Sequence, residues 1–406
     1  MKFPDYLGFT STEAIVQNDS ASRQLGISIP ATSKIAKEQP QTLICFCHLR
    51  WNFVYQRPQH LMTRASETYR VYYVEEPIWG DELRAHVCRQ SDNLTIVVPH
   101  LPHGISHEEF LQYQRQLVDE LIESEKITDF IAWYYTPMAL LFTDHLKPAL
   151  TVYDCMDELS AFLGAPRELI DKEKELMSQA AVMFTGGYSL YEAKRNKHSS
   201  VFAFPSSIDY NHFAAARAKL PDPDDQQSID HPRIGFSGVI DERFDRELIA
   251  ELAQRRPDWQ FIMLGPIVKI DPASLPHGPN VHYLGMKDYK QLPRYFSNWD
   301  VAILPFALNE STRFISPTKT PEYLSAGLPV VSTPIRDVVR TYGSADYVQV
   351  ADNAHAFEQA IGRALAGQHP TDWQAIDTLL AESSWNKTWS DMNKHIRAHA
   401  EIMFEQ

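Results

Sequence analysis

Two series of alternating strand-like and helix-like segments limit the possible folds of this chain more than any other feature. From Thr42 onward, short apolar runs rich in β-branched and aromatic residues alternate with longer stretches of helical character. The same alternation begins again at Arg233, after the charged, proline-containing segment 220–232. Strands that alternate with helices predict a parallel sheet covered on both faces. The sequence therefore predicts an α/β protein with two such domains.

Strands and helices can be placed along both series. In the first series, the expected strands are Leu43–Cys47, Val71–Val74, Leu94–Val98, Phe130–Trp133, Thr151–Asp154, Val182–Phe184 and Val201–Phe204. In the second series, they are Arg233–Phe236, Phe261–Leu264, Val281–Leu284, Val301–Leu304, Pro329–Ser332 and Tyr347–Val350. Helices are expected at His107–Glu125, Arg167–Ala180, Ala354–Ala366 and in the tail from Trp373. We divide the chain into a polar arm (1–40), a first domain (41–219), a linker (220–232), a second domain (233–370) and C-terminal helices (371–406).

Composition and charge argue against several classes of protein. The chain has 406 residues, enough for two domains of ordinary size, and its formal net charge of −14 argues against a nucleic-acid partner. Its four cysteines are too few for a disulfide framework, and no stretch approaches the roughly 20 apolar residues of a membrane span. Residues 1–40 lack the layout of a signal peptide. We expect a cytoplasmic protein, or one that is peripheral on the inner face of the membrane.

The stretch Ser316–Pro334, SPTKTPEYLSAGLPVVSTP, is typical of a turn, a short helix, a stop and a buried strand. Pro321 is tolerated in a first helical turn, and Gly327 is placed to end the helix. The start of a helix has free N–H groups and a positive dipole, so it favours an anion, and Lys319 adds a cation. Glu322 could accept two hydroxyl groups from a vicinal diol. A nucleotide sugar presents both groups, a diphosphate next to a ribose.

Ligands of open α/β sheets bind beyond the carboxyl ends of the strands, and this rule locates the functional loops. In the second domain, these loops are Ser237–Asp245, Gly265–Pro266, Pro305–Lys319 and Thr333–Asp337. In the first domain, they are His48–Arg57, Glu75–Gly80, Tyr134–Pro137, Cys155–Phe162 and Thr185–Ser189.

A set of motifs runs in order from about residue 41 to residue 340. They are CFCHLRWNFVYQRPQHL (Cys45–Leu61), VEEP (Val74–Pro77), YDCMDELSAF (Tyr153–Phe162), FTGGYSLYEAKR (Phe184–Arg195), FPSSIDYNHF (Phe204–Phe213), GFSGVIDERFD (Gly235–Asp245) and the stretch Ser316–Pro334. Together they resemble family 4 glycosyltransferases, in the bacterial branch that makes cell-surface polysaccharides. The resemblance implies the GT-B fold, in which two Rossmann-like domains with parallel sheets face each other and a C-terminal helix crosses back to the first domain. It also implies a nucleoside diphosphate sugar as co-substrate, with no cofactor and no metal ion.

The resemblance assigns the donor to the second domain. The donor-binding residues that it implies are Gly238, Arg243, Ser316, Thr318, Lys319 and Glu322. Gly238 would let the diphosphate approach the backbone, and Arg243 and Lys319 would neutralise it as catalytic residues. Glu322 would bind the ribose hydroxyl groups.

Three donor-side positions leave alternatives open. Arg243 could instead be a surface charge paired with Asp241 or Asp245. Glu322 could merely favour the dipole of its own helix. Many family members have another glutamate eight residues before the ribose glutamate, where it contacts the donor sugar. Here Phe314 occupies that position, which leaves the identity of the sugar open.

We expect the acceptor on the first domain, where aromatic and polar residues follow the predicted strands. The candidate acceptor-binding residues are Trp51, Gln56, Arg57, Tyr134 and Asp157. Trp51 could stack on a sugar ring, or it could pin its loop to the core. Asp154 is the candidate catalytic group that orients or deprotonates the acceptor hydroxyl, although it could equally cap the next helix.

The resemblance therefore implies a retaining glycosyltransferase that moves a hexose from a nucleoside diphosphate sugar to a saccharide acceptor. A lipid-linked acceptor is favoured, and it would bring the protein into peripheral contact with a membrane. The aspartates of YDCMDE do not form a DxD metal motif. The alternatives are a nucleotide-sugar epimerase or a phosphorylase of the GT-B fold, and a non-catalytic saccharide-binding scaffold. Slow hydrolysis of a nucleotide sugar would favour the transferase, and absence of donor binding would favour the scaffold.

Overall fold

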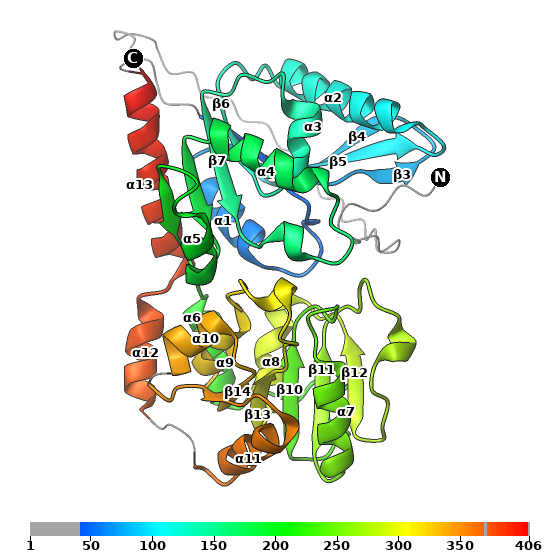
Figure 1. Cartoon of the computed structure of the whole chain (residues 1–406), viewed down its shortest axis with the longest axis vertical. Helices are drawn as coiled ribbons and strands as arrows, with labels where there is room; N and C mark the ends of the chain where they lie inside the picture. The colour runs from blue at the N-terminus through cyan, green and yellow to red at the C-terminus, as the bar shows by residue number, and fades with distance from the viewer. Residues whose placement is uncertain (1–40, 344, 369–371, 405–406) are drawn as a thin grey trace, which may run out of the picture.

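The computed structural model describes residues 41–343, 345–368 and 372–404. Two domains lie one above the other in Figure 1, each with a central sheet, and the C-terminal helix runs along the first domain. This arrangement confirms the predicted α/β fold class. The polar arm that the sequence predicts at 1–40 lies outside the described residues.

The first domain contains a nine-stranded sheet in the order β3-β5-β2-β1-β6-β7-β8-β9, with β4 paired to β5. Its strands are β1 (Thr42–Phe46), β2 (Arg70–Val74), β3 (Ile78–Gly80), β4 (Arg84–Ser91), β5 (Leu94–Pro102), β6 (Phe130–Tyr134), β7 (Leu150–Cys155), β8 (Val182–Thr185) and β9 (Val201–Ala203). Its helices are α1 (Arg57–Ala65), α2 (His107–Ser124), α3 (Leu140–Thr143), α4 (Glu168–Gln179) and α5 (Tyr188–Lys194). Every strand predicted for this domain is present.

Strand β1 shows why the central strands read as continuous apolar runs. Leu43 and Cys45 belong to an apolar cluster on one face of the sheet. Ile44 and Phe46 belong to a second cluster, which includes Leu121 of α2 on the opposite face. A parallel strand covered on both faces needs apolar side chains at successive positions.

The sequence missed β3 and the antiparallel strand β4. Residues of β4 are mostly exposed, and only Ala85, Val87 and Cys88 of its eight residues are apolar. Strand β4 pairs with β5 in a hairpin, with Val87 opposite Val97. An edge strand with polar side chains carries little hydrophobic signal, so its pairing could not be read from the sequence.

The second domain contains a six-stranded parallel sheet in the order β12-β11-β10-β13-β14-β15. Its strands are β10 (Arg233–Ser237), β11 (Gln260–Leu264), β12 (Val281–Gly285), β13 (Val301–Leu304), β14 (Val330–Ser332) and β15 (Gln349–Val350). Its helices include α7 (Arg246–Arg255), α8 (Leu292–Phe296), α9 (Lys319–Ser325), α10 (Arg336–Val338) and α11 (Ala354–Leu365). Leu252 of α7 and Phe357 of α11 share one cluster, while Phe296 of α8 and Leu324 of α9 share another. The predicted strands of this domain are all present.

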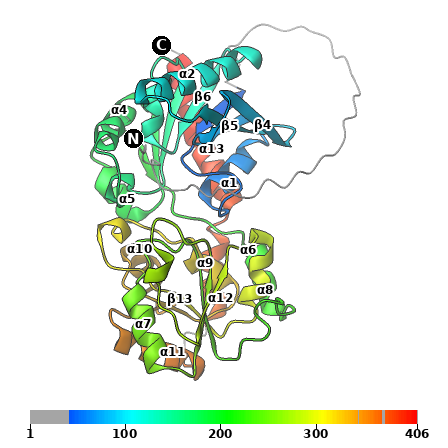
Figure 2. The same ribbon diagram turned by 90° about the vertical axis from the view of Figure 1, so that its right-hand side faces the viewer.

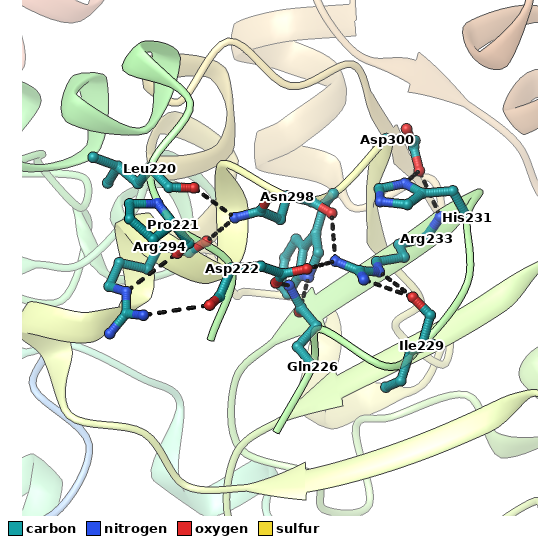
Figure 3. A network of polar contacts seen from close by, with 11 residues as sticks. Leu220, Pro221, Asp222, Gln226, Ile229, His231, Arg233, Arg294, Asn298 and Asp300 are labelled. Atoms are coloured by element: carbon teal, nitrogen blue, oxygen red, sulfur yellow. Dashed lines mark hydrogen bonds and ion pairs between the residues drawn. The ribbon is translucent and has the colours of Figure 1, made fainter. Parts of the chain in front are cut away.

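The segment 220–232 is an integral part of the second domain and not a free linker, as Figure 3 shows. Gln226 is fully buried, and its side-chain oxygen accepts a hydrogen bond from the Trp299 indole at 2.9 Å. Arg233, at the start of β10, pairs with Asp222 at 2.6 Å and donates to the carbonyl of Ile229. The polar composition predicted a loop, but a buried guanidinium needs acceptors, and this loop supplies them.

The chain crosses between the domains at two adjacent places, and the crossings correct the predicted boundaries. Phe213 of α6 (Tyr210–Ala214) and Ile376 of α12 (Trp373–Ala381) lie in the same cluster as Phe296 of the second domain. The Ile208 N–H donates to the Ser383 carbonyl at 2.8 Å, so the two crossings run side by side. Residues 208–219 and 372–381 therefore pack on the second domain, whereas the sequence assigned them to the first domain or its cover.

Helix α13 (Trp385–Phe404) makes the predicted return to the first domain. Trp385, Trp389 and Met392 lie in the cluster that contains Leu43 and Cys45 of β1. Within the described ranges, every helix is too short or too polar to span a bilayer.

Candidate active site

A pocket between the domains brings together loops that follow strands of both sheets. It has a volume of about 30 Å³. Val54 and Tyr55 line it from the first domain, and Gly238, Gly265 and Lys319 line it from the second. These residues follow β1, β10 and β11 or stand on α9, so the pocket lies where the rule for open sheets predicts it.

Helix α9 supplies the predicted lysine and glutamate at this pocket. The Lys319 Nζ lies 2.6 Å from Glu322 Oε2, and both side chains are buried. Burial raises the pKa of the Glu322 carboxyl, and the ammonium of Lys319 opposes that shift. Gly327 ends the helix with φ +81°, a conformation that glycine adopts without strain. The predicted turn, helix, stop and strand are confirmed.

Tyr323 fixes α9 against the end of β10. Its hydroxyl accepts a hydrogen bond from the Ser237 N–H at 2.7 Å, and its ring is fully buried. A side chain at Gly265 would overlap the carbonyl oxygen of Gly238, and Gly265 has φ +139°. The sequence did not single out Tyr323, because a buried tyrosine in a helix reads as ordinary core.

Arg243 lies between the domains and already has an acidic partner. Its guanidinium contacts the Asp241 carboxylate at 2.6 Å, which is the alternative pairing that the sequence left open. The same guanidinium lies 5.1 Å from the ring centroid of Phe162, a residue of the first domain. A diphosphate in the cleft would therefore have to compete with Asp241 for this cation.

Lys269 is a cation of the cleft that the sequence did not single out. Its ammonium lies 5.0 Å from the centroid of the same Phe162 ring. Burial lowers the pKa of Lys269. Its φ of +62° is unusual for a residue with a side chain, and such strain often marks a functional position. The loop after β11 was expected to be functional, but a lone lysine in an apolar run gave no further signal.

Two predicted acceptor-side residues bind each other inside the first domain. Arg57 Nη2 lies 2.8 Å from Asp154 Oδ1, Arg57 Nε lies 2.9 Å from Asp154 Oδ2, and both side chains are almost fully buried. Arg57 also donates to the carbonyl of Phe204 at the first crossing between the domains. Because both carboxylate oxygens of Asp154 are directed at Arg57, this geometry does not support a direct contact of either residue with an acceptor.

The other two acids of the YDCMDE motif have different surroundings. Glu158 pairs with the buried Lys194 at 2.8 Å, and Lys194 also pairs with Glu173 at 2.7 Å. Asp157 is half-buried, and burial raises the pKa of its carboxyl to about 6 against the opposing charge of Arg243. The charges of Arg243 and Lys269 in the second domain act on the Asp157 carboxyl and oppose this rise of its pKa.

The remaining acceptor candidates divide between the core and the loop after β1. Tyr134 is buried, stacks on Phe46 at 5.1 Å and bonds Thr143 through its hydroxyl at 3.0 Å, so this geometry gives it no access to an acceptor. Trp51 is half-buried and packs edge-on to Tyr73.

Two further predicted residues occupy helix starts. Gln56 precedes α1 and forms a capping box with Gln59. Thr318 occupies the equivalent position before α9, where its carbonyl accepts from the Glu322 N–H at 3.4 Å. Phe314, at the position of the usual family glutamate, packs against the core cluster of the first domain.

A second pocket lies within the first domain at the carboxyl edge of its sheet. Its volume is about 70 Å³. Its walls are largely apolar and include Trp79, Phe110, Met138 and Phe142. The sequence did not reveal this pocket, because its walls come from α2, α3 and three strands.

No group of histidine, cysteine, aspartate and glutamate side chains within the described ranges could hold a metal ion. Independence from metal remains a prediction about the reaction.

Known proteins resemble this chain in both sequence and structure. The family model of glycosyl transferases group 1 matches residues 232–367, which form most of the second domain. A relative from Bacillus subtilis (strain 168), named as the teichuronic acid biosynthesis glycosyltransferase TuaH, is 24% identical over 280 residues. This alignment covers 65% of the chain and 66% of the relative, slightly less than two thirds of its length.

Solved structures share the arrangement of both domains. Sucrose-phosphate synthase from Thermosynechococcus elongatus has a TM-score of 0.63 at 15% identity, over 88% of this chain and 98% of that one. The α,α-trehalose 6-phosphate synthase from Burkholderia multivorans has a TM-score of 0.62 at 11% identity, over 89% and 99%. An E. coli structure solved with bound UDP-2-fluoro glucose has a TM-score of 0.63 at 12% identity, over 88% and 99%. The fold is GT-B, and the second domain matches the model of glycosyl transferases group 1.

Proposed function

We propose that this chain, a GT-B protein with a group 1 glycosyl transferase domain, is a retaining hexosyltransferase. It would move a hexose from a nucleoside diphosphate sugar to a saccharide acceptor in the synthesis of a surface polysaccharide. The observation that carries the proposal is the buried pair Lys319 and Glu322 on the first turn of α9, beside Gly238 in the pocket between the domains.

The donor half of the mechanism follows from this pair. In the free protein, Lys319 and Glu322 neutralise each other at 2.6 Å. A bound nucleotide would separate them, because the ammonium would turn to the diphosphate while the carboxylate accepts the ribose hydroxyl groups. Arg243 would leave Asp241 for the same diphosphate. As the glycosidic bond breaks, negative charge grows on the leaving diphosphate, and these cations stabilise it most at that stage.

The acceptor half is assigned to the first domain. The charges of cations in the second domain act on Asp157, the carboxylate proposed to orient the acceptor hydroxyl. Trp51 and the pocket lined by Trp79 would hold the rest of the acceptor. Arg57 and Asp154 would act as positioning residues, since their buried ion pair ties α1 to β7.

Retention of configuration requires no dedicated nucleophile in this scheme. The departing phosphate oxygen would take the proton of the acceptor hydroxyl on the same face of the sugar. Enclosure of the donor between the domains would exclude water, which would otherwise hydrolyse it. We therefore propose a metal-independent and cofactor-independent reaction.

The comparisons support the substrate classes without identifying them. The E. coli protein of the same fold binds UDP-2-fluoro glucose, which supports a nucleotide sugar donor here. The B. subtilis relative is named for teichuronic acid biosynthesis, which supports a polysaccharide acceptor. A lipid-linked acceptor would bring this protein to the cytoplasmic face of a membrane as a peripheral protein.

The test is a panel of nucleoside diphosphate sugars incubated with the protein, with release of the nucleoside diphosphate as the readout. Slow hydrolysis of one donor, reduced in Lys319→Met but not in the exposed control Lys290→Met, is the expected result. Activity should persist in EDTA. Binding without hydrolysis would favour an epimerase or a phosphorylase, and absence of binding to every donor would favour the scaffold alternative that Phe314 raises.

A further inference from the structure

The start of α5 in the first domain is capped by a carboxylate from the second domain. Asp337 Oδ1 accepts hydrogen bonds from the Ser189 N–H at 3.0 Å and from the Ser189 hydroxyl. Both side chains are almost completely buried. Figures 1 and 2 show α5 next to α10, the helix that carries Asp337. First-turn N–H groups lack partners within their helix, so this cap satisfies one of them across the domain boundary.

Gly187 allows the two domains to approach at this point. Its φ of −171° is extended backbone that any residue can adopt, so conformation does not require glycine. Space does require it: a side chain at Gly187 would overlap Asp337 Oδ2 and place its Cβ 2.8 Å from the Cβ of Ser316. Both of these neighbours belong to the second domain. A larger residue at Gly187 would therefore force Asp337 and Ser316 of the second domain to move away from the start of α5.

The capping carboxylate is costly to bury. Asp337 Oδ2 has no hydrogen-bond partner among the described residues. The nearby arginines, Arg336 and Arg340, instead pair with Glu192 at the surface of α5. A buried carboxylate oxygen without a partner destabilises the folded state by about 1–3 kcal/mol.

We infer that Gly187 and Asp337 are positioning residues that set the angle between the domains. Ser316 precedes the turn that leads into Lys319, so the contact joins the first domain directly to the region proposed to hold the diphosphate. The contact fixes where the acceptor half stands relative to the donor half. The kinetic part of this inference rests on the proposed function, whereas the structural part does not.

A pair of adjacent glycines provides a matched experiment. A side chain at Gly186 would overlap the Met156 carbonyl, which belongs to the same domain, whereas one at Gly187 would meet the second domain. Gly187→Ala should increase the radius of gyration in small-angle X-ray scattering and leave the melting temperature close to that of the wild type. Gly186→Ala should lower the melting temperature without changing the radius of gyration of the folded protein.

Kinetic measurements test whether this contact positions the reacting groups or only joins the two domains. In Gly187→Ala, turnover with acceptor should fall by roughly 10- to 100-fold, since misplacement of the reacting groups by about 1 Å has effects of this size. Nucleotide affinity should stay within about twofold, because the donor contacts lie in one domain. Asp337→Asn keeps an oxygen acceptor for Ser189 and should resemble the wild type, while Asp337→Ala removes the cap of α5 and should lower both turnover with acceptor and the melting temperature.

Two results would overturn the inference. One is an unchanged scattering profile in both Gly187→Ala and Asp337→Ala. The other is a changed profile with normal turnover per folded molecule, which would remove the positioning role. If the wild-type protein transfers no sugar from any donor, the proposed function fails, but a changed profile in Gly187→Ala still supports control of the domain angle.

Discussion

The donor half and the acceptor half of this cleft differ in how they use charged residues. In the second domain, Lys319 and Glu322 stand three positions apart on one helix, and Lys319 lines the pocket between the domains. In the first domain, Arg57 and Asp154 come from elements 97 positions apart and close on each other inside the protein. A charged pair that is proposed to bind a ligand and a charged pair that stabilises the fold can therefore look alike in the sequence.

Separation along the chain explains this difference. Residues three apart on a helix share a face whatever the rest of the protein does, so a local motif predicts their meeting. Two residues on different strands and helices meet only through tertiary structure.

The largest effect is expected for Arg57→Met. This change leaves the carboxylate of Asp154 buried without its partner, so the free energy of unfolding should fall by about 3–5 kcal/mol. Urea denaturation measures it. The double variant Arg57→Met with Asp154→Leu should recover part of the loss, since no charge then remains buried. A loss below about 1 kcal/mol in the single variant would show that the pair is not structural, and it would restore a ligand role.

The next effect is expected for the donor pair. Lys319→Ala should lower turnover by roughly 10²-fold, because it removes a cation that acts on the growing charge of the leaving group. Glu322→Ala should instead weaken nucleotide binding by roughly 1–3 kcal/mol, the value of a lost charge-assisted hydrogen bond. Steady-state kinetics and calorimetry measure these separately, with the exposed Lys290→Ala as control. Equal effects of Lys319→Ala and Lys290→Ala on turnover would contradict the assignment.

A smaller effect is expected from the protonation of Asp157. Its pKa of about 6 predicts that transfer falls as the pH drops through 6, because the protonated carboxyl no longer accepts a hydrogen bond from the acceptor. Turnover at pH 6 should be roughly half the plateau value. Asp157→Asn should lower the plateau and remove this limb from the pH profile. A limb that persists unchanged in the variant would assign it to another group.

The raised pKa of Asp157 also predicts how the contribution of this residue to stability changes with pH. Burial raises the pKa of Asp157 in the folded protein, so the folded state holds a proton that the unfolded chain has released. This group therefore contributes less stability as the pH rises from the ordinary carboxyl range through about 6. Asp157→Asn should be at least as stable as the wild type at pH 7 in chemical denaturation.

The smallest effect is expected for Trp51. Trp51→Ala should raise the acceptor KM by a few-fold, in line with about 1 kcal/mol for an aromatic contact, and leave nucleotide affinity unchanged. Trp51→Phe should recover much of the effect. A lower melting temperature with normal kinetics per folded molecule would instead identify Trp51 as a residue that pins its loop against Tyr73.

The fold was predictable where periodicity is strong. The buried strands of both sheets can be recognised in the sequence as apolar runs. Strand β4 is an exposed edge strand and has no such run. The crossings were misplaced because α6 and α12 pack on the second domain through only a few side chains, such as Phe213 and Ile376. Composition also suggested a linker at 220–232, and the structure shows it as a loop that packs on the second domain and supplies the acceptors that Arg233 needs.

Only the part of the candidate site that is formed by neighbours in the sequence could be predicted. The helix α9 and its glycine stop follow from SPTKTPEYLSAG, and their geometry is confirmed. The sequence analysis missed Lys269, Phe162 and Tyr323. The contact that suggests a role for each of them is with a residue that is distant in the sequence. Tyr134 and Asp154 were placed at the acceptor because strand ends usually face the cleft, yet both side chains turn into the core.

In the proposed function, the charged groups that bind the nucleotide belong to the second domain. The most direct test is a crystal structure of the protein with the nucleoside diphosphate that binds most tightly in calorimetry. The predicted result places the diphosphate against Lys319 and the start of α9, with Lys319 and Glu322 separated and Glu322 on the ribose. A nucleotide held by residues of the first domain, with the Lys319–Glu322 pair still closed, would contradict the account.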